Sequence, residues 1–275
     1  MPVREQRSPT PRRHIHRVAA RAHRDMPVVT ATGDLDEHAA RVLLDSAARL
    51  TSGGPVLIRA DALTGWTEAG VTALADPGQL GQLRPALIAP PAHLLASSPA
   101  AAQLDMYPSA DTAAAVLSRP PGALPLPPAG ADAPARWAHR MFTAEPSSVF
   151  TARHWIRDLL SDWGCRPAAD STLVAFSELA SGVLAHDGAD LPTSAYLWRD
   201  HDAQRMLTVS VLDANPDLGT HRSGLRLVAT LADHLGCYRQ TTTPAGKILW
   251  FTMRLPTPPS CVSTEPTQVT GGRSC

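Results

Sequence analysis

The sequence has little of what marks a secreted, membrane-spanning or nucleic-acid-binding protein. Its 275 residues include only four cysteines, scattered without a CxxC pair, so neither a disulfide framework nor a zinc site is predicted and a reducing, cytoplasmic location is favoured. No apolar run reaches the roughly 18 residues of a membrane span. The 25 basic and 25 acidic residues cancel, so no overall field draws the chain to nucleic acid or a membrane.

Arginine and proline divide the chain into segments. Residues 1–25 hold seven arginines without a following apolar core, which predicts a basic, solvated, disordered arm rather than a secretion signal. The alternative is a nucleic-acid-linked module whose arm touches phosphates, and the zero net charge argues against it. Six prolines predict an extended linker over residues 119–135, and residues 257–275 lack periodicity, as a disordered tail does. Two folded units remain, residues 26–118 and 136–256.

The first unit alternates short apolar strands with amphipathic helices, which predicts an α/β sandwich. A helix over residues 36–50 has an apolar face and is stopped by Gly53-Gly54. The expected strands are 28–32, 55–59 and 86–89, and the other expected helices are 69–74, 100–104 and 111–117.

The order of motifs in residues 26–118 resembles the STAS domain, the fold of anti-sigma-factor antagonists. The resemblance rests on Gly33-Asp34-Leu35-Asp36, on Gly70, and on the segment before the last helix. In that family the loop before the short helix reads Asp-Ser-Ser-Gly and its first serine accepts phosphate. Here Glu68 stands at the acceptor position, so the resemblance implies that the phospho-switch is lost. Glu68 either imitates the phosphorylated state or is an ordinary acid in the first turn of a helix.

The second unit is predicted to place two helices before a set of strands. Ser148 is a plausible cap for the first helix, which reaches Trp163, and the second runs over residues 169–185. Aromatic residues on the first helix follow the 3.6-residue period and indicate core packing rather than a ligand site. Strands are expected over 142–146, 194–198, 206–212 and 246–255, and a further helix over 225–236.

Glu178 and Gly182 lie one helical turn apart, so both can face one ligand. They are followed by His186-x-Gly188, by Asp213 at a strand end, and by Gly224 before a helix. This order resembles the Bergerat-type ATP-binding domain (HATPase_c) of the GHKL superfamily, in its anti-sigma-factor serine-kinase branch. The resemblance covers roughly residues 140–256 and implies a second α/β sandwich.

The resemblance assigns roles to individual positions. Glu178 corresponds to the general base, while Gly182 replaces the asparagine that binds magnesium, so no metal ligand is predicted. Asp213 corresponds to the aspartate that binds the adenine amino group, although an aspartate at a strand end also starts turns. Gly224 and Arg222 correspond to groups near the phosphates.

Two further positions belong to the expected site: His186 at the end of the helix, and Ser181, which could hold a metal in place of the missing asparagine. The resemblance thus implies a bacterial cytoplasmic regulator that fuses an antagonist-like unit to a kinase-like unit. It would bind a sigma factor, anti-sigma or antagonist proteins, or a second copy of itself, with ATP-magnesium binding weakened or lost. The alternative is an active protein serine/threonine kinase that uses Glu178.

Overall fold

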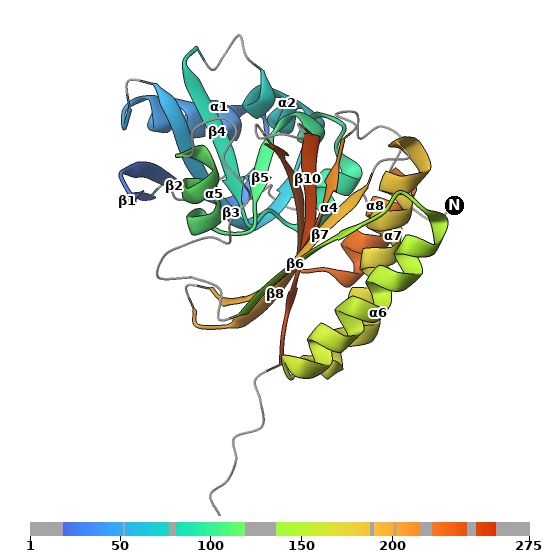
Figure 1. Ribbon diagram of the computed structural model, residues 1–275. Coiled ribbons are helices and arrows are strands. Elements are labelled where there is room, and N and C mark those ends of the chain that lie inside the picture. The colour runs from blue at the N-terminus through green and yellow to red at the C-terminus, as the bar shows by residue number, and fades with distance from the viewer. Residues whose placement is uncertain are drawn as a thin grey trace, which may run out of the picture.

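The computed structural model describes residues 19–51, 53–76, 81–118, 136–187, 190–200, 202–214, 222–240 and 246–256. These residues form two five-stranded sheets, each with helices packed against it (Figure 1). The predicted fold class, α/β and α+β sandwiches, is confirmed. No helix in the described ranges is long and apolar enough to cross a membrane. The expected linker 119–135 and tail 257–275 lie outside the described residues.

The first sheet has the order β1-β2-β3-β4-β5, with β1 antiparallel to β2 and the remaining pairs parallel. Buried residues of α1 and α2 pack in one cluster with Val29 and Ile58, while Ala113 and Ala114 of α5 pack in another with Val28 and Leu57. Because side chains alternate along a strand, the helices cover opposite faces of this sheet. The elements are β1 (Ala19–His23), β2 (Met26–Leu35), α1 (Glu37–Ala48), β3 (Gly54–Trp66), α2 (Glu68–Ala75), β4 (Leu83–Ile88), α4 (Ala92–Ser97), the 3-10 helix η1 (Ala100–Gln103), β5 (Asp105–Tyr107) and α5 (Ala110–Leu117).

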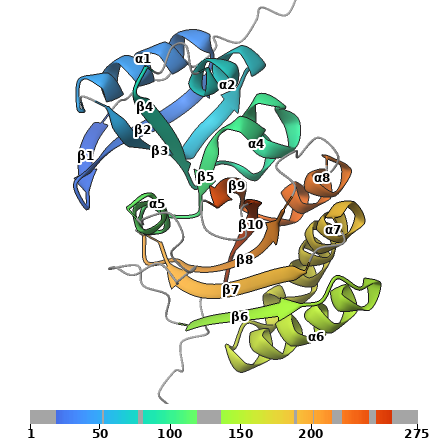
Figure 2. The ribbon, with the colours of Figure 1, turned by 45° about the horizontal axis from the view of Figure 1, so that its top comes forward.

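The second sheet is antiparallel throughout, in the order β6-β7-β8-β10-β9. Three helices, α6, α7 and α8, lie together on one side of it (Figure 2). The elements are β6 (Arg136–Phe142), α6 (Pro146–Asp162), the 3-10 helix η2 (Arg166–Ala168), α7 (Ala169–Asp187), β7 (Leu191–Arg199), β8 (Arg205–Asp213), α8 (Arg222–Leu231), β9 (His234–Gln240) and β10 (Gly246–Arg254).

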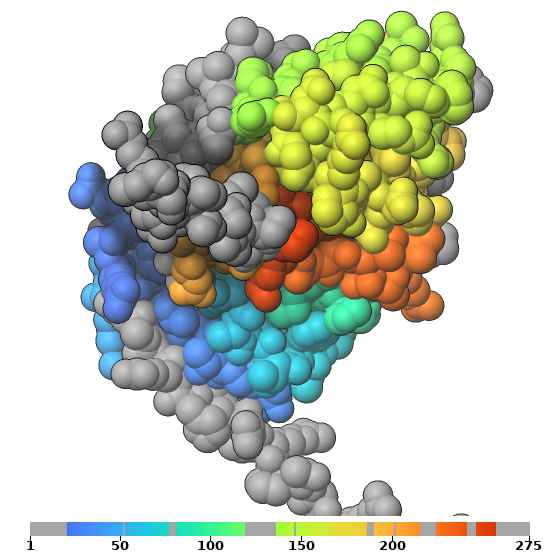
Figure 3. Space-filling model, turned by 90° about the horizontal axis from the view of Figure 1, so that it is seen from below, coloured from blue at the N-terminus to red at the C-terminus, as the bar shows by residue number. Residues whose placement is uncertain are grey.

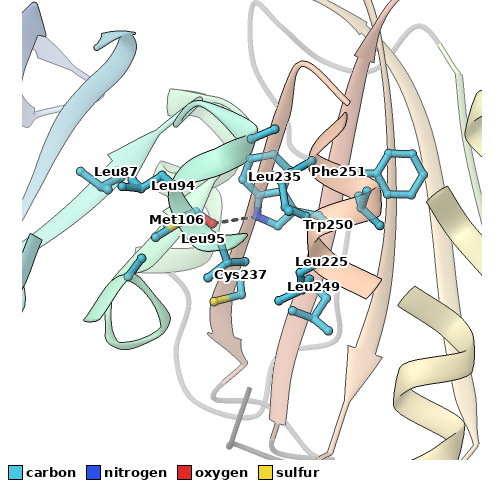
Figure 4. Close-up of a cluster of buried hydrophobic side chains, with 14 of the residues drawn as sticks. Leu87, Leu94, Leu95, Met106, Leu225, Leu235, Cys237, Leu249, Trp250 and Phe251 are labelled. Atoms are coloured by element: carbon cyan, nitrogen blue, oxygen red, sulfur yellow. Dashed lines mark hydrogen bonds between the residues drawn. The ribbon is translucent and has the colours of Figure 1, made fainter. Parts of the chain in front are cut away.

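The two sheets meet along a contact that we call the seam, formed by residues 90–106 of the first unit and residues 225–240 and 246–250 of the second. Figure 4 shows Trp250 of β10 reaching Met106 of β5, and its indole nitrogen donates to the Met106 carbonyl oxygen at 2.8 Å. Helix α4 packs on α8 and β9. One continuous buried cluster includes residues of both sheets, so the two units share a core. Figure 3 shows the two units lying against each other from below, the first in blue to blue-green and the second in yellow-green to red.

Three expectations for the first unit need correction. Residues 19–25, assigned to a disordered arm, form β1 and a tight turn, because Arg24 and Asp25 both have positive φ and let β1 fold back on β2. Helix α4 was missed because its six residues are too few to show a period. Residues 100–104, expected to be a helix, form only a 3-10 turn.

Three expectations in the second unit also need correction. The helix expected over 225–236 ends at Leu231, and His234 begins β9, which pairs antiparallel with β10 and buries Leu235 and Cys237. The strand expected over 142–146 lies earlier, as β6. Helix α6 begins at Pro146 with Glu145 as its N-cap, so Ser148 is not the cap. Helix α7 matches its expected range closely.

Candidate functional site

Helix α7 carries the two residues on which the expected nucleotide site depends. Glu178 and Gly182 are both half-buried, one turn apart on the same side of the helix. Ser181 is exposed. Leu179, Ala180 and Val183 are buried in the core, so packing of the apolar face fixes the direction in which Glu178 projects.

Gly224 lies directly against Glu178. A Cβ atom at Gly224 would stand 3.4 Å from Oε2 and 3.5 Å from the backbone oxygen of Glu178. The structure therefore brings together two residues that are 46 positions apart (224 − 178) and that the sequence assigned to one site. One detail is different from the expectation, because Gly224 is the third residue of α8 rather than part of the loop before it.

Asp213 is the last residue of β8 and its side chain is completely buried. Met206 of the same strand belongs to a cluster with Tyr196, on the face of the sheet turned away from α6, α7 and α8. Because side chains alternate, Val211 and Asp213 lie on the opposite face, the one covered by α6, α7 and α8. Asp213 is thus on the same side of the sheet as Glu178.

The remaining expected site residues are only partly described. His186 is in the last turn of α7 and Arg222 is the first residue of α8, but their side chains lie outside the described residues. Gly188 and residues 215–221 also lie outside them. The described part of the chain holds no group of three histidine, cysteine or acidic side chains that could bind a metal ion. Gly182 offers no ligand, so the described residues do not fit a magnesium ion at this position.

Glu68, the expected switch position, has a structural partner in the first unit. Its Oε1 accepts a hydrogen bond of 3.0 Å from the backbone nitrogen of Ala100, at the start of η1. The helix it begins is capped by Thr67, whose hydroxyl accepts from Gly70 N at 3.1 Å. A Cβ at Gly70 would lie 2.4 Å from the Leu35 oxygen, so only glycine allows α2 to approach β2 this closely.

Two cavities lie between the units, and sequence reasoning missed both. One, of about 480 Å³, is lined by residues of α2, β4, η1, β5, β9 and β10. The other, of about 300 Å³, is lined by the carboxyl ends of β4 and β5 and by the β7–β8 hairpin. No sequence signal marks either, because each cavity is lined by residues of both units, which are far apart in the sequence.

Comparison with known proteins adds little to this geometry. No protein-family model matches the chain, and no curated protein matches it. Among solved structures, the chain is similar to the RsbU and RsbW domains of Rv1364c from Mycobacterium tuberculosis, with 21% identity and a TM-score of 0.36. The match covers 46% of this chain and 34% of that one, so it spans about a third of the other chain's length. That TM-score is too low to carry a functional assignment.

Proposed function

We propose that this protein is a regulator of the anti-sigma and antagonist type that acts by binding partner proteins rather than by transferring phosphate. The proposal rests on the resemblance of both units to the two partners of that system. In the resembling families the antagonist and the kinase are separate proteins that bind each other. Here the two units that resemble them lie in one chain and share a buried seam.

The observation that carries the proposal is that Glu178, the expected base, has only a glycine at the position where the resembling family carries its metal-binding asparagine. The carboxylate packs against the backbone of Gly224, while Gly182, one turn further along α7, has no group that could hold a metal. A metal offsets the charge that develops on the transferred phosphate, so loss of the metal ligand abolishes catalysis while the fold stays intact. Binding to partner proteins requires neither the metal nor catalysis.

The test is a partner-binding assay with and without ATP-magnesium, using candidate sigma factors and antagonist proteins from the same genome. We expect binding that survives removal of nucleotide and is unchanged in Glu178→Gln. Glu145→Gln, an exposed acid at the start of α6, is the matched control. Binding that requires ATP would contradict the proposal.

An active kinase is the second candidate, and the contact between Glu178 and Gly224 favours it, because the expected base and the expected phosphate-side glycine are side by side. Calorimetric titration with ATP-magnesium on the wild type and on Gly182→Asn separates the two. Strengthened binding in Gly182→Asn would support the register of the degenerate site. Phosphate transfer to a partner by the wild type, abolished in Glu178→Gln, would establish the kinase instead.

A further inference from the structure

The cavity of about 480 Å³ lies in the seam, next to the amino ends of β4 and β5. Its walls come from both units, since Arg84 and Leu104 line it from the first and Cys237 and Lys247 from the second. Clefts of this volume between two packed units are where small molecules most often bind. None of its lining residues belongs to the expected site around Glu178, although Lys247 is the cross-strand partner of Asp213.

The charges in this cavity do not balance. Three cationic side chains line it, those of Arg84, Arg239 and Lys247, against one carboxylate, that of Asp105. Asp105 is already paired, because Arg239 donates to it from Nε at 3.3 Å, from Nη2 at 3.2 Å and from its backbone nitrogen at 3.0 Å. Within the described ranges, no ion pair joins Arg84 or Lys247 to the one carboxylate of the lining, so two cationic side chains line the cavity besides the Arg239–Asp105 pair.

Lys247 contributes one of the cationic side chains that line this cavity. It is the only lysine in a chain with 24 arginines. Among the residues that the structure describes, its ammonium group donates one hydrogen bond, of 3.1 Å, to the Ala102 carbonyl oxygen. An ammonium group has three hydrogens, so two remain for an anion. The carbonyl holds the group in place and does not neutralise it.

Most of the other lining residues are apolar, and Gln103 and Tyr238 add an amide and a hydroxyl. Leu74, Leu83, Pro85 and Leu104 contribute from the first unit. Burial raises the pKa of Cys237 to about 12, so its thiol is neutral and adds neither charge nor reactivity near pH 7. A ligand that matches these walls has an apolar body beside its charged group.

We propose that this cavity binds a small amphiphilic anion, a phosphate ester or carboxylate with an aromatic or aliphatic body. Arg84 and Lys247 hold the negative group from the two sides of the seam, and the leucines hold the body. Because the two cations belong to different units, such a ligand bridges the units and stabilises their docked arrangement by mass action. The protein thereby acquires a small-molecule input, distinct from any nucleotide at Glu178.

The test is calorimetric titration of the full chain with phenyl phosphate at pH 7.5 and low salt. Inorganic phosphate serves as the comparison without an apolar body, and benzyl alcohol as the one without charge. We expect a single site, at least tenfold weaker affinity for both comparison compounds, and a rise in melting temperature with phenyl phosphate. Lys247→Met and Arg84→Met are each expected to weaken binding at least tenfold, which is about 1.4 kcal/mol.

Arg157→Met is the control, because Arg157 is an exposed arginine on α6, away from the seam, and its loss is expected to change affinity less than twofold. Arg84 is also exposed, so its variant tests the site even if Lys247→Met unfolds. Absence of phenyl phosphate binding to the wild type would overturn the proposal, as would an affinity equal to that of the wild type in both Lys247→Met and Arg84→Met. Inorganic phosphate binding as tightly as phenyl phosphate would overturn the role of the apolar walls.

Discussion

The indole nitrogen of Trp250 donates a hydrogen bond of 2.8 Å to the backbone carbonyl of Met106, and this bond joins the two sheets at the centre of the seam. Both residues are almost completely buried. Met106 lies on the short strand β5, at the edge of its sheet, so β5 pairs with β4 on one side and with no other described strand of this sheet. A side chain from the second unit therefore satisfies a carbonyl of the first.

Trp250→Phe is expected to destabilise the protein by about 1–3 kcal/mol, because it leaves the buried Met106 carbonyl without its donor. Urea denaturation measures the change. Trp137→Phe is the control, since Trp137 is 42% exposed on β6, and a change within about 0.5 kcal/mol is expected there. Equal stability of Trp250→Phe and the wild type would show that this bond contributes nothing to the seam.

Gly236→Ala is expected to strain the seam. A Cβ at Gly236 would lie 2.5 Å from Cζ2 of Trp250 and 2.8 Å from Cβ of Met106, closer than packed atoms can stand. Overpacking of this kind costs about 1–3 kcal/mol. Gly224→Ala is the matched control, because its Cβ would meet no atom closer than 3.4 Å. Thermal unfolding of the two variants should therefore differ, and similar melting temperatures would contradict the geometry.

The turn between β1 and β2 offers a stabilising substitution. Asp25 is exposed with φ of 67°, a conformation that costs a side chain about 1 kcal/mol and suits glycine. Asp25→Gly is expected to stabilise the protein by about 0.5 kcal/mol.

Arg24→Gly relieves a similar φ of 47° but removes the Nε contact of 2.9 Å to the buried Asp111. We expect it to be destabilising, by about 1 kcal/mol. A gain in stability for Arg24→Gly would refute the importance of that ion pair.

Substitutions at Glu68 separate its structural role from a role as a fixed negative charge. Glu68→Ala removes the acceptor for Ala100 N and is expected to cost about 0.5–1.5 kcal/mol. Glu68→Gln keeps a side-chain oxygen there, so most of that stability should return. If the charge stands in for a phosphate, partner binding will weaken in Glu68→Gln although the fold remains stable. Unchanged partner binding in Glu68→Gln would leave only the capping role.

Acid should loosen the seam through His234. Burial lowers the pKa of His234 below its ordinary value of 6.5, against a smaller opposing effect of its hydrogen bond to the Pro90 oxygen. The unfolded chain therefore takes up a proton at a higher pH than the folded chain does. The stability that depends on neutral His234 is complete above about pH 6.5 and is lost as the pH falls toward the lowered pKa.

The measurement is the free energy of unfolding in urea between pH 8 and pH 5. His234→Asn keeps a donor for the Pro90 oxygen but cannot titrate, so its stability should fall less steeply than that of the wild type across this range. His154→Gln, an exposed histidine on α6, is the control and should follow the wild type. Parallel curves for the wild type and His234→Asn would exclude His234 as a source of acid sensitivity.

Local features of the site could be predicted from sequence, and contacts across the seam could not. The range of α7 and the spacing of Glu178 and Gly182 follow from helical periodicity, which needs only neighbouring residues. The first three residues of β9, 234–236, were assigned to the preceding helix because Leu231 and Leu235 lie four positions apart, as on one face of a helix. Strand β1 was missed because its arginine and alanine residues show no apolar alternation, and its partner β2 decides its conformation.

The sequence by itself determined which chemical groups are present: a carboxylate at position 178, no side chain at 182, and a glutamate where the resembling family accepts phosphate. Those facts depend on residue identity alone, so the packing of the chain does not change them. Only the tertiary structure decided that Gly224 packs on Glu178, that Glu68 caps η1, and that Arg84 and Lys247 line one cavity. Each of these contacts joins residues 32 or more positions apart, which are brought together by the packing of helices and sheets rather than by any local preference.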